Sequence, residues 1–133
     1  MIPKPTYTYT ESKFAYQSMF LVARQALKSG YDAILDATFL REDYRAEAVK
    51  KLAKHYSVAV VVCVLCDQEV ARGRNTQRNA IVPEASFNRL SASFEKPKKA
   101  IFVHSDKRTP ESAARYVIRK LREMKPRRAR VSG

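Results

Sequence analysis

The chain has 133 residues, 45% of them hydrophobic, which is enough for one domain with a single core. It carries 26 Lys and Arg against 13 Asp and Glu, and this net charge of +13 favours polyanionic partners such as nucleic acid and nucleotides. The longest apolar run, Val58 to Leu65, is too short for a bilayer, which takes about 20 residues, so no membrane partner is expected. Because the N-terminus lacks the apolar core of a signal peptide, we expect a cytoplasmic protein.

Helical and strand patterns alternate along the chain. A capping-box pattern at Thr8 and Glu11 and a helix ending at Gly30 predict a first helix over about residues 10–29. The alternation predicts an α/β fold with a parallel sheet flanked by helices. The other predicted elements are strands ending at Asp36 and over 58–65 and 100–103, and helices over 41–56, within 67–79, over 84–94 and from Pro110 onward.

The final helix has clear signals at its start and along one face. Thr109 is the expected cap, and Pro110 is the expected first residue. We expect its apolar stripe to be buried, namely Ala113, Ala114, Val117, Ile118 and Leu121.

The apolar run 33–35 predicts a buried parallel strand whose carboxyl end carries Asp36. Ligands bind at that end of open α/β sheets, and an aspartate there is suited to hold Mg²⁺ beside the phosphates of a nucleotide. The alternative is that Asp36 and Thr38 only cap the following helix.

A second candidate group consists of Arg72, Arg74 and Arg78, which we place on a helix with no acidic residue between them. Guanidinium groups match phosphate oxygens in a bidentate way, so these side chains are candidates for a phosphate clamp. The alternative is an exposed basic helix. The basic residues from Arg119 onward leave a similar choice between a solvated helix end with a tail and a nucleic-acid contact.

The two cysteines, Cys63 and Cys66, have metal-site or redox spacing, but they lie in or next to a predicted strand. Residues three apart on a strand point to opposite faces, and no second Cys/His pair follows. We therefore expect ordinary core packing.

Taken together, these motifs resemble the P-loop kinases of the polynucleotide-kinase and zeta-toxin-like group. The run Ile34-Leu35-Asp36-Ala37-Thr38-Phe39 is similar to the Walker-B-like strand of that family, and Arg45 stands at the spacing of a frequent family arginine. The arginines 72–78 resemble its lid, and residues 82–97 resemble the segment after the lid.

The resemblance implies ATP and Mg²⁺ as cofactors and assigns roles to single residues. Asp36 would orient Mg²⁺ or its waters, and the lid arginines Arg72, Arg74 and Arg78 would stabilise the transferring phosphate. Ser105 and Asp106 would lie near the adenine. Thr38 and Arg45 would face the phosphate acceptor.

The chain departs from the family in one respect, because it contains no G-x-x-x-x-G-K-[ST] motif. The predicted fold therefore lacks the first strand–P-loop–helix unit, and three explanations stay open. The chain is part of a longer kinase, or it is a remnant without catalysis, or a partner chain supplies the P-loop. A homodimer or a partner chain would complete the sheet.

We expect a domain over residues 1–124 and a basic tail over 125–133. The expected function is that of an ATP-dependent kinase-type domain for a nucleic-acid end or a small hydroxyl compound, inactive or incomplete as this chain. The alternative is a non-enzymatic module that binds nucleic acid or another polyanion through its Arg and Lys patches and its tail.

Overall fold

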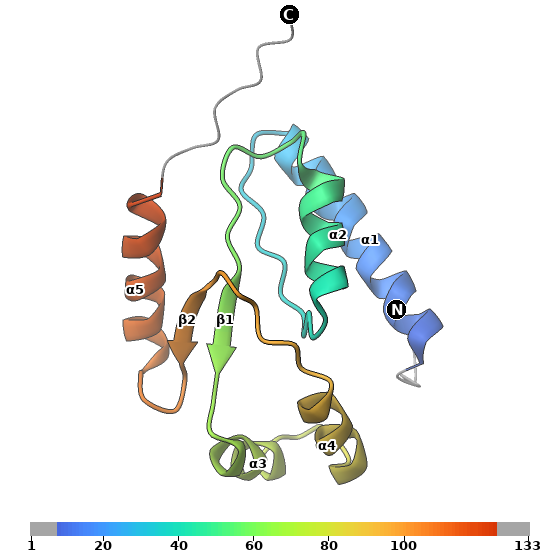
Figure 1. The fold of residues 1–133 in the computed structure, drawn as a ribbon, viewed down its shortest axis with the longest axis vertical. Coiled ribbons are helices and arrows are strands. Elements are labelled where there is room, and N and C mark those ends of the chain that lie inside the picture. The colour runs from blue at the N-terminus through green and yellow to red at the C-terminus, as the bar shows by residue number, and fades with distance from the viewer. Residues whose placement is uncertain (1–7, 125–133) are drawn as a thin grey trace, which may run out of the picture. The chain divides into compact units, whose positions relative to one another are not determined.

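The computed structural model describes residues 8–124, and the predicted basic tail lies outside this range (Figure 1). The described residues form two compact units. The first consists of residues 8–39 and 43–56, and the second consists of residues 40–42 and 57–124. Residues 40–42 belong to the second unit because Glu95 holds them: its N–H donates to the Leu40 carbonyl at 2.8 Å, and its carboxylate accepts from the Glu42 N–H at 2.7 Å.

The first unit contains helices α1 (Tyr9–Lys28) and α2 (Glu42–Leu52). The Thr8 hydroxyl caps α1 by accepting from the Glu11 N–H at 3.3 Å, as the capping-box pattern predicts. The helix ends at Ser29, and Gly30 follows with φ of +85°, a left-handed conformation that favours glycine.

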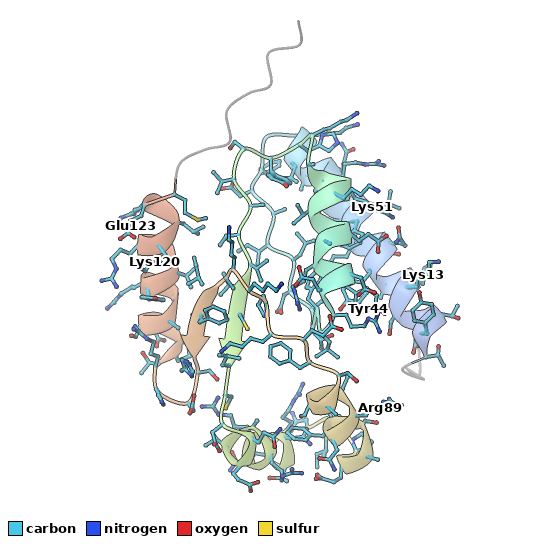
Figure 2. The ribbon with its side chains drawn as sticks, viewed as in Figure 1. Lys13, Tyr44, Lys51, Arg89, Lys120 and Glu123 are labelled. Carbon is cyan, nitrogen blue, oxygen red and sulfur yellow. The ribbon has the colours of Figure 1, made fainter. Side chains whose placement is uncertain are left out.

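Aromatic rings hold α1 against α2 in this unit. The buried Tyr16 ring stacks on Tyr44 with centroids 4.9 Å apart and is also near Phe20, at 6.2 Å. Figure 2 shows Tyr44 and Lys51 on α2. The Lys51 ammonium lies 5.8 Å from the centre of the Phe20 ring, which adds a cation–π contact between the two helices.

The predicted strand ending at Asp36 does not form, and this prediction was wrong. Residues 31–36 have no strand assignment, and Ile34 is 96% exposed. A strand needs a neighbour to pair with its backbone N–H and C=O groups, and the described sheet contains only the two strands of the second unit. A run of three apolar residues cannot bury itself without that neighbour.

The second unit contains strands β1 (Val62–Leu65) and β2 (Ile101–His104), which pair in parallel from Val62 opposite Ile101 to Leu65 opposite His104. Its helices are α3 (Gln68–Thr76), α4 (Glu84–Ala92) and α5 (Pro110–Arg122), with α5 beside β2 (Figure 1). The α/β fold with a parallel sheet flanked by helices is therefore confirmed.

The first of these strands is shorter and less buried than the sequence predicts. Residues 58–61 are not part of β1, and Val64 is 64% exposed while Cys63, on the other face, is buried. The run 58–65 is apolar on both faces, which predicts a central strand. This prediction was wrong for the described sheet, because β1 has a described neighbour on one side only.

The start of α5 is as predicted, but its buried face is not. The Thr109 hydroxyl accepts from the Ser112 N–H at 3.2 Å, and Pro110 is the first helical residue. No residue of α5 is buried, and Ile118 and Leu121 are exposed. A sheet of two short strands offers too little surface to cover the whole stripe.

None of the helices in the described part of the chain combines the length and the apolar content that crossing a membrane requires.

Candidate functional site

The carboxyl ends of β1 and β2 lie side by side and define the candidate site of the second unit. Leu65 is opposite His104, and the Ser105 N–H donates to the Leu65 carbonyl at 2.9 Å, one residue past β2. The turns that begin at Cys66 and Ser105 therefore leave the same edge of the sheet, which is the edge where α/β proteins bind ligands.

Arg74 reaches this edge from α3. Asp67 fixes the start of α3, since its carboxylate accepts from the N–H groups of Glu69 and Val70 at 2.9 and 3.3 Å. Arg74 lies on the last turn of this helix.

The Arg74 guanidinium group joins the two strand ends. Its Nη1 donates to Ser105 Oγ at 3.1 Å and to Cys66 Sγ at 3.8 Å, and its Nη2 donates to the Ser105 carbonyl at 2.9 Å. These contacts do not use every N–H of the guanidinium group. The structure thus brings together two of the predicted site residues, Arg74 and Ser105, and adds Cys66, which sequence analysis assigned to the core.

Asp106 follows directly and has an unusual environment. Its Oδ1 is buried and has no hydrogen-bond partner among the described residues. Burying a carboxylate oxygen without a donor is costly, so a donor from a ligand or a water molecule would stabilise this turn.

Arg72 has partners within the protein that the sequence order did not reveal. It forms ion pairs with Glu84 and, at 3.8 Å, with Glu69, and its guanidinium carbon lies 5.0 Å from the centre of the Phe87 ring. Both Glu84 and Phe87 belong to α4, so Arg72 connects α3 to α4. Its charge is therefore partly offset by carboxylates, whereas no carboxylate within residues 8–124 forms an ion pair with Arg74.

Arg78 does not share the helix with the other two arginines, and this part of the prediction was wrong. The helix ends at Thr76 and is capped at Gln77, so Arg78 lies in the exposed connection to α4. Asn75 shapes this connection: its side-chain amide donates to the Val82 carbonyl at 2.8 Å and accepts from the Val82 N–H at 3.0 Å. Sequence analysis missed Asn75, although an Asn near a helix end often bonds to nearby backbone groups. Its burial is visible only in the structure.

In the first unit, Asp36 is exposed and lines a hollow of about 270 Å³. The other lining residues are Ser12, Ala15, Tyr16, Met19 and Ala37. The described residues contain no group of three or more His, Cys, Asp or Glu that could hold a metal ion. Asp36 alone suits Mg²⁺ only in the water-mediated role, because Mg²⁺ keeps several waters and takes few protein ligands.

The segment after Asp36 is fixed by hydrogen bonds to the backbone N–H and to the backbone carbonyl of Phe39. The Tyr16 hydroxyl accepts from the Phe39 N–H at 3.0 Å and lies 3.3 Å from the Thr38 hydroxyl. Arg45 Nη1 donates to the Phe39 carbonyl at 2.6 Å. These contacts hold Phe39 at φ of 40°, an uncommon conformation for a residue with a side chain.

Arg45 is only 6% exposed, so its side chain is buried, and it contacts the Thr38–Phe39 turn through the Phe39 carbonyl. Sequence analysis missed Tyr16 as the partner of this turn, because helical spacing indicates only that such a residue belongs to the core. The structure groups Asp36, Thr38 and Arg45 in one unit and Arg74, Ser105 and Asp106 in the other.

The comparison with family models gives one match, to a family described as AAA domain, over residues 2–97. No curated protein and no solved structure matches the chain significantly. The family match includes Asp36, Arg45 and Arg74 and ends before Ser105. Because the matched region is well over half of the 133 residues, this chain belongs to the AAA domain family, a P-loop kinase-like group.

Proposed function

We propose that this chain is an ATP-dependent phosphotransferase-type domain of the polynucleotide-kinase and zeta-toxin-like group, acting on a nucleic-acid end or a small hydroxyl compound. Membership of the P-loop kinase-like family supports the class. The observation that carries the nucleotide site is the position of Arg74, held on Ser105 at the carboxyl ends of β1 and β2. The next residue in the chain, Asp106, has the orphaned Oδ1.

In this proposal the site residues bind and orient ATP and Mg²⁺. ATP would supply the phosphoryl group, and Mg²⁺ would offset its charge. The remaining N–H groups of Arg74 would bind phosphate oxygens, and Asp106 Oδ1 would accept from an N–H or O–H group of the nucleotide. Asp36 would orient the Mg²⁺ waters, and Arg72 and Arg78 would add positive charge.

The acceptor side rests on the turn after Asp36. Thr38 would contact the hydroxyl substrate, while Arg45 acts as a positioning residue because its guanidinium group is buried and bonded to the Phe39 carbonyl. Without a G-x-x-x-x-G-K-[ST] motif in its 133 residues, this chain by itself should transfer phosphate weakly or not at all.

Thermal unfolding with and without millimolar Mg-ATP tests the nucleotide site. A ligand that binds only the folded state raises the melting temperature, by the equivalent of about 2.7 kcal/mol when it is present at 100 times its Kd. We expect an increase for the native chain, a smaller one for Asp106→Asn and Arg74→Ala, and none for Asp36→Ala.

The control is Arg89→Ala, which removes an exposed arginine of α4 and should leave the increase unchanged. An unchanged melting temperature of the native chain in Mg-ATP would overturn the proposal of a working nucleotide site.

A second candidate function is binding of nucleic acid or another polyanion without catalysis. The net charge of +13 and an arginine-rich hollow on α5 favour it. This function predicts affinity that falls steeply with salt and does not respond to ATP.

A further inference from the structure

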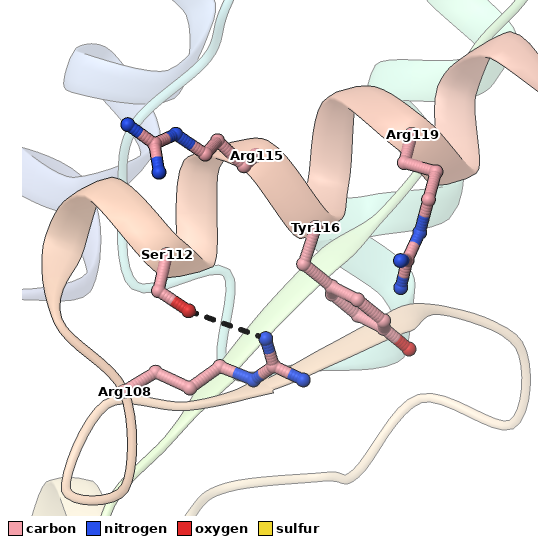
Figure 3. Close-up of a pocket in the computed structure, with 5 residues that line it drawn as sticks. All are labelled: Arg108, Ser112, Arg115, Tyr116 and Arg119. Atoms are coloured by element: carbon pink, nitrogen blue, oxygen red, sulfur yellow. Dashed lines mark hydrogen bonds between the residues drawn. The ribbon is translucent and has the colours of Figure 1, made fainter.

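One face of α5 and the turn before it form an open hollow of about 310 Å³ that the proposed phosphotransfer does not use (Figure 3). An inference about this hollow deepens the second candidate function and rests on it. We call its five lining residues the α5 arginine cluster: Arg108, Ser112, Arg115, Tyr116 and Arg119. All of them belong to the second unit.

Tyr116 organises the cluster. The guanidinium carbon of Arg108 lies 4.5 Å from the centre of the Tyr116 ring, and that of Arg119 lies 5.5 Å from it. Figure 3 shows the two arginines on either side of this ring. Arg108 Nη1 also donates to the Ser112 hydroxyl at 3.4 Å. The ring therefore keeps two cationic groups close together, so less side-chain freedom is lost when they bind an anion.

The charge of the cluster is not neutralised locally. Among the described residues, no carboxylate forms an ion pair with Arg108, Arg115 or Arg119, and Glu123 pairs with Lys120 at 3.7 Å. Residues 107–122 contain six Lys and Arg and only one acidic residue, Glu111. Several guanidinium groups beside an open hollow, without counter-charges, favour an anionic ligand.

We propose that the α5 arginine cluster binds the phosphate backbone of nucleic acid without sequence preference. Guanidinium groups bind phosphate oxygens in a bidentate way, and two of them sit within 5.5 Å of one ring centre, which suits neighbouring phosphates of a single chain. Arginines lie on both sides of the Tyr116 ring, so its faces are less open for a base to stack on. We therefore expect contacts to phosphates, which carry no sequence information.

A lipid surface fits these residues less well. Helices that lie on membranes place a continuous apolar face among the acyl chains. The cluster is a polar hollow whose single ring is flanked by cations.

Fluorescence anisotropy with a labelled thymidine oligonucleotide of about 20 nucleotides, without ATP, measures the binding and its salt dependence. Each lost phosphate contact lowers the slope of log K against log salt by about 0.7 for single strands. For Arg108→Ala combined with Arg119→Ala we expect the slope to fall by about 1.4 and the affinity at 0.1 M salt to fall roughly ten- to thirty-fold.

The matched control is Arg24→Ala combined with Arg89→Ala, which removes the same charge from exposed positions on α1 and α4. It should retain nearly native affinity. Equal losses in the two double variants would overturn the proposal, because they would show a response to net charge alone.

Tyr116 gives an independent test of the geometry. Tyr116→Phe keeps the ring and should keep the affinity, whereas Tyr116→Leu releases the two arginines and should weaken binding several-fold without a change in net charge. Equal affinities of these two variants would contradict the proposed role of the ring.

Binding to vesicles that contain phosphatidylserine tests whether the cluster binds the phosphate groups of lipids instead of those of nucleic acid. We expect the native chain and the Arg108→Ala, Arg119→Ala variant to bind vesicles equally. The proposal is overturned if the native chain does not bind the oligonucleotide, or if the cluster variant loses vesicle binding while its oligonucleotide binding stays native. Since no nucleotide is present, failure here leaves the Mg-ATP experiment unaffected.

Discussion

Arg74 donates to both the hydroxyl and the carbonyl oxygen of Ser105, with Nη1–Oγ and Nη2–O distances of 3.1 and 2.9 Å. Through this pair, α3 is connected to the turn that follows β2. The same side chain that would contact phosphate therefore also fixes the edge of the sheet where a nucleotide would bind.

Arg74→Ala should lower the free energy of unfolding by about 1 kcal/mol, because a charge-assisted bond to Ser105 is lost from a solvent-exposed site. Arg74→Lys should recover only part of this, since an ammonium group cannot reproduce the two-nitrogen contact. Urea unfolding measures the free energy of unfolding of both variants. Arg89→Ala is the control, and a loss in Arg74→Ala no larger than in this control would refute the structural role of the pair.

Arg45→Met should destabilise the chain by about 2–3 kcal/mol, because it leaves the Phe39 carbonyl without its donor and removes a hydrogen bond from a charged group. Tyr16→Phe should cost about 1 kcal/mol, since it keeps the stacked ring and removes only the hydroxyl that accepts from the Phe39 N–H. Both values come from denaturant unfolding. Native stability of Arg45→Met would show that the side chain does not support this turn.

Asn75→Ala should lower stability by about 2 kcal/mol, because Asn75 is buried and both bonds to Val82 are lost. Asn75→Asp should be at least as harmful, since it replaces the donating NH₂ by an acceptor that faces the Val82 carbonyl. The neighbouring exposed Gln77→Ala should have little effect. Comparable unfolding midpoints for all three variants would contradict this account.

Stability should also depend on pH through Glu47. Hydrogen bonds from Gln17, and then from Lys51, hold the pKa of the Glu47 carboxyl below its usual 4.5. A lowered folded pKa means that the contribution is fully present above pH 4.5 and is lost as the pH falls through the folded pKa. The effect should be small, because the Glu47 and Lys51 side chains remain 36% and 41% exposed.

The measurement is the difference in unfolding free energy between the native chain and Glu47→Gln, taken at neutral pH and below pH 4.5. We expect this difference to shrink in acid. A difference that stays constant, or grows, as the pH falls would show that Glu47 is not ionised in a stabilising contact.

Features set by neighbouring residues could be predicted from the sequence. The caps at Thr8 and Thr109 and the glycine after α1 involve groups only a few residues apart, so the local pattern is enough to place them. The parallel pairing of β1 with β2 also follows from the alternation of helix and strand.

Features that need a partner far along the chain could not be placed in this way. Arg72 has a local partner in Glu69, but its ion pair with Glu84 joins it to another helix. Arg45 resembles a site residue in its spacing, but the fold buries it against Phe39. Neither outcome is encoded in local periodicity, because each depends on which elements pack together.

By itself the sequence determined the fold class, the caps that start α1 and α5, the strong positive charge and the kinase-like order of motifs, all of which depend on local pattern and composition. The tertiary structure decided which apolar residues are buried and which charges are paired. It left Ile34 exposed, because a strand cannot form without a neighbouring strand to satisfy its backbone. It also brought Arg74 to Ser105, residues that are distant in the sequence but meet where two parallel strands end.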